Sequence, residues 1–343
     1  MAVPKEEERK KLVCVTGGCG FIGSWLVRTL LDHHHSYTVR ATVQDLSDPS
    51  QTYHLRSLLP SNSDESRLSL FQADLLDSGS LWAAIDGCEG VFHLASPCFL
   101  EDPREPQTQL LDPAIQGTLN VLEACRKAKV RRVVLTSSIS AMVPNPSWPH
   151  DKVVDESCWT DIDFCKAHKK WYPVSKTLAE RAAWEFSKQH GLDVVAIHPS
   201  TCLGPLLQPS LNASSAVLLQ LLQGSEESQE HHWLGSVDVR DVAKAQLLLY
   251  ETPCASGRYL CTNGIYQFKD FAEIVAGICP GYPLHKFAKE TQPGLMGCKD
   301  AAKRLLDLGL KFRPIQDTLK EAADSLKDRG FLGQPALISS SSS

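Results

Sequence analysis

The feature that most restricts the fold of this chain is a glycine-rich turn close to its start. The β-branched run KLVCVT (residues 11–16) leads directly into GGCGFIG and then into the amphipathic stretch SWLVRTLLDHH. Gly17, Gly20 and Gly23 therefore have GxxGxxG spacing between a predicted strand and a predicted helix. Glycines permit a tight turn, and the free N–H groups at the helix start attract an anion. This arrangement predicts a dinucleotide pyrophosphate site, and a purely structural turn is the alternative.

The N-terminal half continues as an alternation of short apolar strands and longer helical patterns. In the helical segment 113–130, for example, Ile115, Leu119 and Leu122 lie on one face. Strands that alternate with helices form right-handed crossovers and hence a parallel sheet. The sequence thus predicts an α/β fold with a Rossmann-type, doubly wound parallel sheet. Its strands are expected over residues 11–16, 36–44, 67–74, 90–96, 131–138 and 192–200.

From about residue 200 the alternation becomes irregular, because Pro205, Pro209 and Gly224 interrupt it. We expect a smaller, mostly helical C-terminal lobe made of discontinuous pieces. The terminal run of serines has no apolar side chains to pack. The expected division is a dinucleotide-binding domain over residues 11–200 with a return segment near 236–255, a substrate lobe over 201–235 and 256–332, and flexible tails over 1–10 and 333–343.

Composition excludes several classes of protein. The 343 residues include 35 Lys and Arg against 40 Asp and Glu, a net charge of −5. The chain therefore lacks the basic surplus that favours nucleic-acid phosphates or anionic membranes. Residues 1–10 are charged where a signal peptide is apolar, and no apolar run reaches the roughly 18 residues of a membrane span. We expect a cytoplasmic protein with no nucleic-acid or membrane partner.

The twelve cysteines contain no CxxC pair and no Cys/His spacing typical of a zinc site. In the cytoplasm they are expected to be reduced and mostly buried, with no bound metal. A redox role for Cys158 and Cys165 stays open. Cys19, Cys98 and Cys202 lie in or beside the motifs described here, so we expect alkylation to inactivate the protein and bound dinucleotide to protect it.

A tyrosine and a lysine lie one helical turn apart in WYPVSK. The spacing of Tyr172 and Lys176 places both on one face of the helix predicted over 171–191. A phenol with a pKa of about 10 is a poor acid at neutral pH, and a nearby ammonium lowers that pKa. Ser138 is the last residue of the predicted strand 131–138, which ends in TSS. It therefore lies at the carboxyl edge, where parallel sheets bind ligands. We predict that Ser138 binds a substrate carbonyl while Tyr172 exchanges its proton. Ordinary surface residues are the alternative.

The end of the second strand decides which dinucleotide binds, since an acid there suits NAD and an arginine suits NADP. Gln44 is neither, and Asp45 follows it. Arg40 is expected on the same strand face as Gln44, about 13 Å back along the strand. Asp74, at the end of the third strand, is placed to contact the adenine amino group, and a solvated loop acid is the alternative. The choice of cofactor stays open at this point.

The motifs TGGCGFIG, HLASP, TSS and YPVSK, in this order, resemble those of the extended short-chain dehydrogenase/reductases. Further strings, YTVRATV, DESCW, HPSTCLGP and RYLCTN, are similar to its plant branch of dihydroflavonol reductases, cinnamoyl-CoA reductases and cinnamoyl-CoA-reductase-like proteins. The resemblance runs from about Val13 to about Leu332. It implies that Ser138, Tyr172 and Lys176 are the catalytic triad, with Tyr172 and Lys176 also contacting the cofactor NAD(P)H. The other implied cofactor contacts are Gly17, Gly20, Phe21 and Ile22 at the pyrophosphate, Asp74 and Leu75 at the adenine, Ala95 and Ser96 at the nicotinamide ribose, and Thr136, Pro199, Ser200 and Thr201 at the nicotinamide.

Two departures from the branch bear on specificity. NADPH is usual there, but Gln44 replaces the branch arginine, and DPSQ replaces a segment that often carries a lysine. We therefore expect relaxed or NADH-leaning preference, with Arg40 as the substitute cation if NADPH is preferred. The chain also reads KKWYPVSK where cinnamoyl-CoA reductases usually read NWYCYGK. This favours reduction of an aldehyde or ketone over reduction of a thioester.

The leading hypothesis is a reductase for an aromatic, phenylpropanoid-like aldehyde or ketone, reversible as an alcohol dehydrogenase. A cinnamoyl-CoA or dihydroflavonol reductase is the near alternative. A nucleotide-sugar epimerase or dehydratase uses the same triad, and a non-catalytic cofactor-sensing protein is a third class. His231, His232 and Trp233, and separately Trp148, are candidates for substrate contact or for plain packing. We expect a small-molecule partner and a monomer or homodimer.

Overall fold

The computed structural model describes residues 10–33, 36–59, 65–98, 103–149, 152–224, 229–231, 233–282, 287–291 and 301–333. Seven strands form one parallel sheet in the order β10-β6-β5-β4-β1-β2-β3. Because the order runs outward in both directions from β1 and β4, the sheet is doubly wound, as predicted. Its strands are β1 (Lys11–Thr16), β2 (Tyr37–Val43), β3 (Leu68–Gln72), β4 (Gly90–His93), β5 (Arg132–Thr136), β6 (Val194–Pro199) and β10 (Gly257–Cys261).

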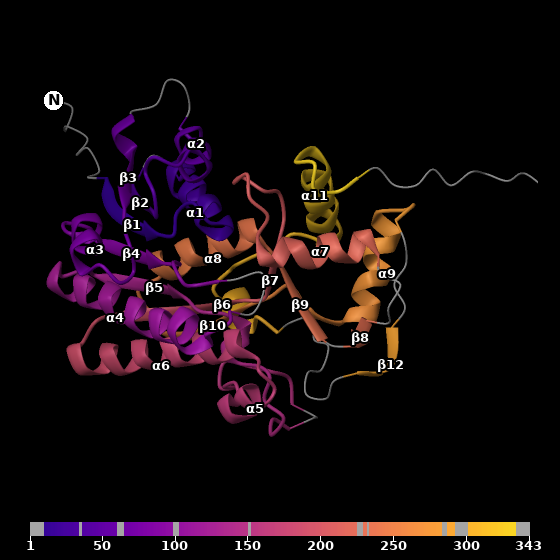
Figure 1. Cartoon of the computed structure of the whole chain (residues 1–343). Coiled ribbons are helices and arrows are strands. Elements are labelled where there is room, and N and C mark those ends of the chain that lie inside the picture. The colour runs from indigo at the N-terminus through magenta and orange to yellow at the C-terminus, as the bar shows by residue number, and fades with distance from the viewer. Residues whose placement is uncertain are drawn as a thin grey trace, which may run out of the picture.

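Helices cover both faces of the large sheet (Figure 1). Leu26 and Leu30 of α1 share an apolar cluster with Val242 and Leu249 of α8 on one face. Helices α3, α4 and α6 bury a second cluster on the other face. The two layers consist of α1 (Phe21–Asp32), α2 (Pro49–Arg56) and α8 (Val239–Glu251) on the first face, and α3 (Ser78–Ile85), α4 (Asp112–Lys127) and α6 (Trp171–His190) on the second.

The strand register aligns the carboxyl ends of the central strands. Thr16 at the end of β1 lies opposite His93 at the end of β4. Thr136 at the end of β5 lies opposite Ile197, near the end of β6. Loops that follow these strands therefore leave the sheet at one common edge, where doubly wound sheets bind their ligands.

Two strands belong to sheets other than those expected. The return segment near 236–255 contributes α8 to the large domain, but its strand β9 (Trp233–Asp238) pairs with β7 (Thr201–Leu203) and β11 (Ile265–Gln267) in a separate sheet. Conversely β10, expected in the lobe, is the edge strand of the large sheet, parallel to β6. A short buried strand has the same apolar pattern in either sheet, so periodicity does not distinguish them.

In the part of the chain that the structure describes, the C-terminal lobe contains this small sheet, a pair of short strands and several helices (Figure 1). Among the described helices, none combines the length and the apolar character that crossing a bilayer requires. The remaining lobe elements are α7 (Ala213–Gln223), β8 (Gln229–His231), α9 (Phe268–Ile278), β12 (Phe287–Thr291), α10 (Lys303–Asp307) and α11 (Ile315–Asp328). Short helices elsewhere are η1 (Glu65–Arg67), the π turn η2 (Gln107–Leu111), η3 (Ile139–Ala141) and α5 (Ile162–Ala167).

Candidate active site

The glycine turn packs too closely for side chains. Gly17 has φ +67°, in the left-handed region that favours glycine. A Cβ on Gly23 would lie 2.2 Å from the carbonyl oxygen of Gly17, so α1 can approach the turn only without a side chain there. Helix α1 starts at Phe21 with no side-chain cap on Gly20. Its first N–H groups are left without a capping side chain, which fits the pyrophosphate of a dinucleotide.

A cleft of about 560 Å³ continues from this turn along the carboxyl ends of β2, β3 and β4. The Asp74 carboxylate accepts the backbone N–H of Leu76 at 2.8 Å, which shapes the loop after β3. A Cβ on Gly117 of α4 would lie 2.8 Å from Leu75, so α4 closes against this loop. The cleft brings together residues that the sequence separated widely, and its lining includes Thr42, Gln44, Asp74, Leu75, Ala95, Ser96 and Cys98.

Arg40, the substitute cation expected if NADPH is preferred, is not among the residues that line this cleft. Its guanidinium donates to the carbonyl oxygens of Ala84 at 3.3 Å and Asp86 at 2.6 Å, at the end of α3. It also lies over the Phe71 ring, 5.1 Å from the centroid. These contacts hold the charge on the α3 side of the sheet, partway back along β2.

The loop after β2 is organised by Gln51, which the sequence analysis overlooked. The side-chain carbonyl of Gln51 accepts the N–H groups of Gln44 at 2.9 Å and Asp45 at 3.2 Å. Hydrogen bonds from Ser47 lower the pKa of Asp45, and those from Ser50 lower the pKa of Asp48. Asp45 is exposed and Asp48 is partly exposed, and both carboxylates are charged at neutral pH. The loop beside Gln44 therefore presents negative charge.

The structure brings Ser138, Tyr172 and Lys176 together at the carboxyl edge of β5. Helix α6 carries Tyr172 and Lys176 one turn apart, and Gly191 ends it in a left-handed conformation, as predicted. Ser138 caps η3, where its hydroxyl accepts the N–H of Ser140 at 3.1 Å. Burial raises the pKa of the Tyr172 phenol, and a hydrogen bond with Ser138 opposes that rise. Tyr172 is thus held protonated, as a proton donor must be.

Lys176 is buried and points into the sheet edge. Its ammonium donates to the carbonyl oxygen of Thr136 at 3.1 Å. Burial lowers the pKa of Lys176 to about 8, although Cys98 and Glu180 oppose that shift. The sequence predicts that Lys176 lowers the pKa of Tyr172; in the structure its ammonium is directed toward Thr136, and Ser138 is the residue whose contact lowers that pKa.

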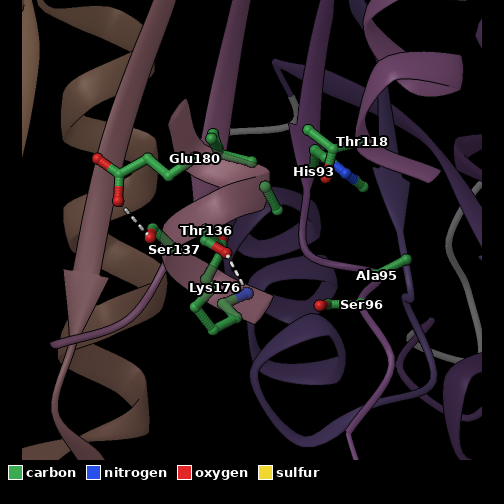
Figure 2. Close-up of a pocket in the computed structure, with 10 residues that line it drawn as sticks. His93, Ala95, Ser96, Thr118, Thr136, Ser137, Lys176 and Glu180 are labelled. Carbon is green, nitrogen blue, oxygen red and sulfur yellow. Dashed lines mark hydrogen bonds between the residues drawn. The ribbon is translucent and has the colours of Figure 1, made fainter. Parts of the chain in front are cut away.

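A cavity of about 10 Å³ lies behind Lys176 (Figure 2). Thr16 accepts the N–H groups of Leu94 and Ala95, so its own hydroxyl proton is free to donate to His93 Nδ1, 2.8 Å away. Burial lowers the pKa of His93 to about 3, with a further contribution from Lys176. His93 is therefore neutral with its proton on Nε2. The His of HLASP was a signal that sequence reasoning did not use.

The residues expected at the nicotinamide lie at the ends of neighbouring strands. Pro199 ends β6 and Thr201 begins β7, with Ser200 between them donating to Thr262 at 2.9 Å. The Thr136 hydroxyl donates to Gln246 of α8 at 2.9 Å, so its side chain is engaged on that face. Within the described ranges, no three His, Cys, Asp or Glu side chains converge as metal ligands.

Cys158 and Cys165 lie in different apolar clusters. Burial raises the pKa of each thiol to about 11, and Cys158 donates to the carbonyl oxygen of Met142 at 3.1 Å. Both are free thiols with low nucleophilicity at neutral pH.

Known proteins share this architecture. Residues 13–260 match the family described as "NAD dependent epimerase/dehydratase family". The chain belongs to this family. Cinnamoyl-CoA reductase 1 of Petunia hybrida is 47% identical over 326 residues, which are 95% of this chain and 95% of that protein. This confirms the resemblance to the extended short-chain dehydrogenase/reductases and their plant branch.

Similar solved structures extend the comparison. Vestitone reductase from alfalfa has a TM-score of 0.78 at 35% identity, covering 94% of this chain and 100% of that one. Yeast methylglyoxal/isovaleraldehyde reductase Gre2, complexed with NADPH, has a TM-score of 0.78 at 26% identity, covering 93% and 99%. All three relatives are named reductases, and this chain is an oxidoreductase of the same class.

Proposed function

We propose that this protein transfers hydride from NAD(P)H to the carbonyl carbon of an aromatic, phenylpropanoid-like aldehyde or ketone. The observation that carries the proposal is the meeting of Ser138, Tyr172 and Lys176 at the carboxyl edge of β5, with Tyr172 kept protonated. The overall change is reduction of C=O to CH–OH, with NAD(P)H oxidised to NAD(P)⁺ and one proton taken up. The reverse reaction is alcohol oxidation.

Each of the three residues has one task in this proposal. The bound cofactor supplies the hydride. Ser138 donates a hydrogen bond to the substrate oxygen and aligns it beside the Tyr172 hydroxyl. Tyr172 gives its proton to that oxygen as negative charge develops there. The Lys176 ammonium then stabilises the phenolate and holds the nicotinamide ribose, with Thr136 fixing its position.

An apolar wall next to Ser138 supports an aromatic substrate. Met142 is fully buried in a cluster that Ile139, Trp148 and Trp233 also join as partly buried members. Trp148 also donates to the carbonyl oxygen of Lys152, so its ring has a fixed orientation. The indole rings would pack against a planar substrate held at Ser138. His232 and the side chain of His231 lie outside the described residues.

Thioester reduction is the second candidate, because a relative of 47% identity is named for cinnamoyl-CoA. A thioester would consume one NAD(P)H to release the thiol and an aldehyde. The motif KKWYPVSK argues for the aldehyde or ketone instead, since it differs from the acyl-CoA-reducing pattern beside Tyr172.

For the cofactor we propose relaxed or NADH-leaning preference. Gln44 is neutral, Arg40 is held elsewhere, and the Asp45 and Asp48 carboxylates lie on the same loop. A 2′-phosphate would meet no cation from these four side chains.

These proposals are tested with a panel of substrates, where the loss of NADH or NADPH absorbance measures turnover. We expect turnover with cinnamaldehydes, phenylacetaldehyde or dihydroflavonols, and less with cinnamoyl-CoA. Faster oxidation of NAD(P)H with cinnamoyl-CoA than with the aldehydes and ketones would favour thioester reduction. Interconversion of a nucleotide sugar without net NAD(P)H oxidation would show an epimerase, and cofactor binding without any turnover would show a sensing protein.

A further inference from the structure

Two contacts join helix α6 to the end of β5, side by side (Figure 2). Lys176 donates to the Thr136 carbonyl at 3.1 Å, and the hydroxyl of Ser137 donates to the Glu180 carboxylate at 2.6 Å. Lys176 and Glu180 are one helical turn apart, and their partners are consecutive residues. The next residue in the chain is Ser138. Any change in these two contacts therefore alters the position of Ser138 relative to the helix that carries Tyr172.

Glu180 is a buried charge whose carboxylate has four polar or cationic partners, Ser137, Trp184, His198 and Arg258. Burial opposes its ionisation, yet hydrogen bonds and charge from His198 and Arg258 lower the pKa of Glu180 to about 2. His198 Nε2 lies 2.7 Å from the carboxylate, and Arg258 Nε also lies 2.7 Å from it. A buried carboxylate without such partners is strongly disfavoured. The charge is therefore maintained by contacts from β6 and β10.

Arg258 extends the same network to the segment after Ser138. Its guanidinium donates to the carbonyl oxygens of Cys158 at 2.6 Å, Glu156 at 2.8 Å and Ala141 at 3.3 Å. It also stacks over the Trp159 ring, 3.8 Å from the centroid. These contacts explain the DESCW and RYLCTN strings, neither of which had a role in the chemistry. One buried ion pair thus ties α6, β6 and β10 to both sides of Ser138.

We propose that Glu180 is a positioning residue for the reduction, with Arg258 as its counter-ion, and that it sets the geometry of Ser138 against Tyr172 and Lys176. This role rests on the proposed function of those three residues. A network that served only stability would change the free energy of unfolding without changing the pH dependence of catalysis. The test therefore measures the pH dependence of kcat.

The charge of Glu180 supplies that readout. Its negative charge raises the pKa of Lys176, which burial holds at about 8. Removing it leaves the Arg258 cation uncompensated, so both effects disfavour the Lys176 ammonium and lower its pKa. In a pH profile of carbonyl reduction, the fall of kcat at alkaline pH, here called the alkaline limb, would then move to lower pH. The titratable groups facing this pair are His93, Cys98 and Tyr172 around Lys176, and His198 and Arg258 around Glu180.

The experiment compares Glu180→Gln with Glu185→Gln in the full-length protein. Glu185 lies on the same helix but is exposed. For Glu180→Gln we expect kcat to fall by about tenfold to a hundredfold, the scale of a misplaced reacting group. KM for NAD(P)H should stay within about twofold while the alkaline limb moves down. Deuterated cofactor should show a larger isotope effect, because hydride transfer is the slowed step. Glu185→Gln should match the unmodified protein.

Ser137→Ala removes the hydrogen bond that Ser137, the neighbour of Ser138, donates to Glu180, and it leaves the charges of Glu180 and Arg258 in place. We expect a several-fold lower kcat with the alkaline limb unchanged. Folded Glu180→Gln protein with unmodified kcat and an unmoved limb would overturn the proposal. If Glu180→Gln does not fold, an unchanged kcat in Ser137→Ala overturns it instead. Absence of carbonyl turnover in the unmodified protein would refute the proposed function and this role with it, whereas an unaffected Glu180 variant of an active enzyme refutes only this role.

Discussion

The ammonium of Lys176 lies 3.1 Å from the carbonyl oxygen of Thr136, two residues before Ser138. The lysine is thereby fixed to the strand end that presents the serine. A buried ammonium has few other acceptors, so the contact also orients it toward the substrate edge of the sheet. This contact joins the helix that carries Tyr172 and Lys176, the proposed proton donor and its stabilising cation, to the strand end before Ser138, the proposed carbonyl anchor.

Tyr172→Phe should lose nearly all reductase activity. The variant keeps the ring and removes the hydroxyl group that would give the proton, so we expect kcat to fall by about 10²–10⁴-fold. Cofactor binding, measured by the quenching of tryptophan fluorescence, should change little. The glycine turn and the cleft along β2, β3 and β4 are unchanged in this variant. Retained turnover would disprove the assignment of Tyr172 as proton donor.

The rate of carbonyl reduction should fall as the pH rises through about 8, the pKa of Lys176. Burial disfavours the charged amine, so the ammonium predominates below this value and is lost above it. A neutral amine cannot stabilise the Tyr172 phenolate. A pH profile of kcat checks this, with Lys176→Arg as the comparison, since a guanidinium stays protonated and its residual activity should lack that limb. An unmodified limb in Lys176→Arg would contradict the assignment.

Gln44→Arg should move cofactor preference toward NADPH. A guanidinium at this position can bind the 2′-phosphate through charge-assisted hydrogen bonds, worth about 1.5–3 kcal/mol, or roughly tenfold or more in the ratio of kcat/KM values. Arg40→Lys is the matched control and should leave that ratio unchanged, because Arg40 is bound to the Asp86 carbonyl. The idea fails if the unmodified protein already prefers NADPH by about tenfold.

Cys98 should be the thiol whose alkylation blocks the cofactor cleft. It is exposed and lines the cleft, whereas Cys19 is partly buried and Cys202 is buried. Although the residue is accessible, desolvation of its thiol by surrounding protein atoms raises the pKa of Cys98, so labelling by iodoacetamide should be slow at neutral pH and faster at alkaline pH. Peptide mapping should show protection of Cys98 by NAD(P)H. Cys254, exposed between α8 and β10, should label equally with and without cofactor.

Local spacing was sufficient to predict the glycine turn before α1 and the face of α6 that carries Tyr172 and Lys176. The glycines act on neighbouring backbone, and Tyr172 and Lys176 meet because a helix brings residues four apart onto one face. The alternation of strands and helices likewise restricts the chain to a doubly wound sheet. These features depend on contacts between residues close in sequence, which is why the sequence alone determined them.

Tertiary structure decided the features that depend on distant partners. The sequence left the contacts of the Arg40 side chain undecided, and the structure shows that it binds carbonyl oxygens at the end of α3. The placement of β10 depended on pairing with β6, which its apolar pattern does not encode. Glu180 and Arg258 are 78 residues apart, and nothing in the sequence shows that they pair. A buried charge is stable only where an opposite charge meets it. That meeting is a property of the assembled fold.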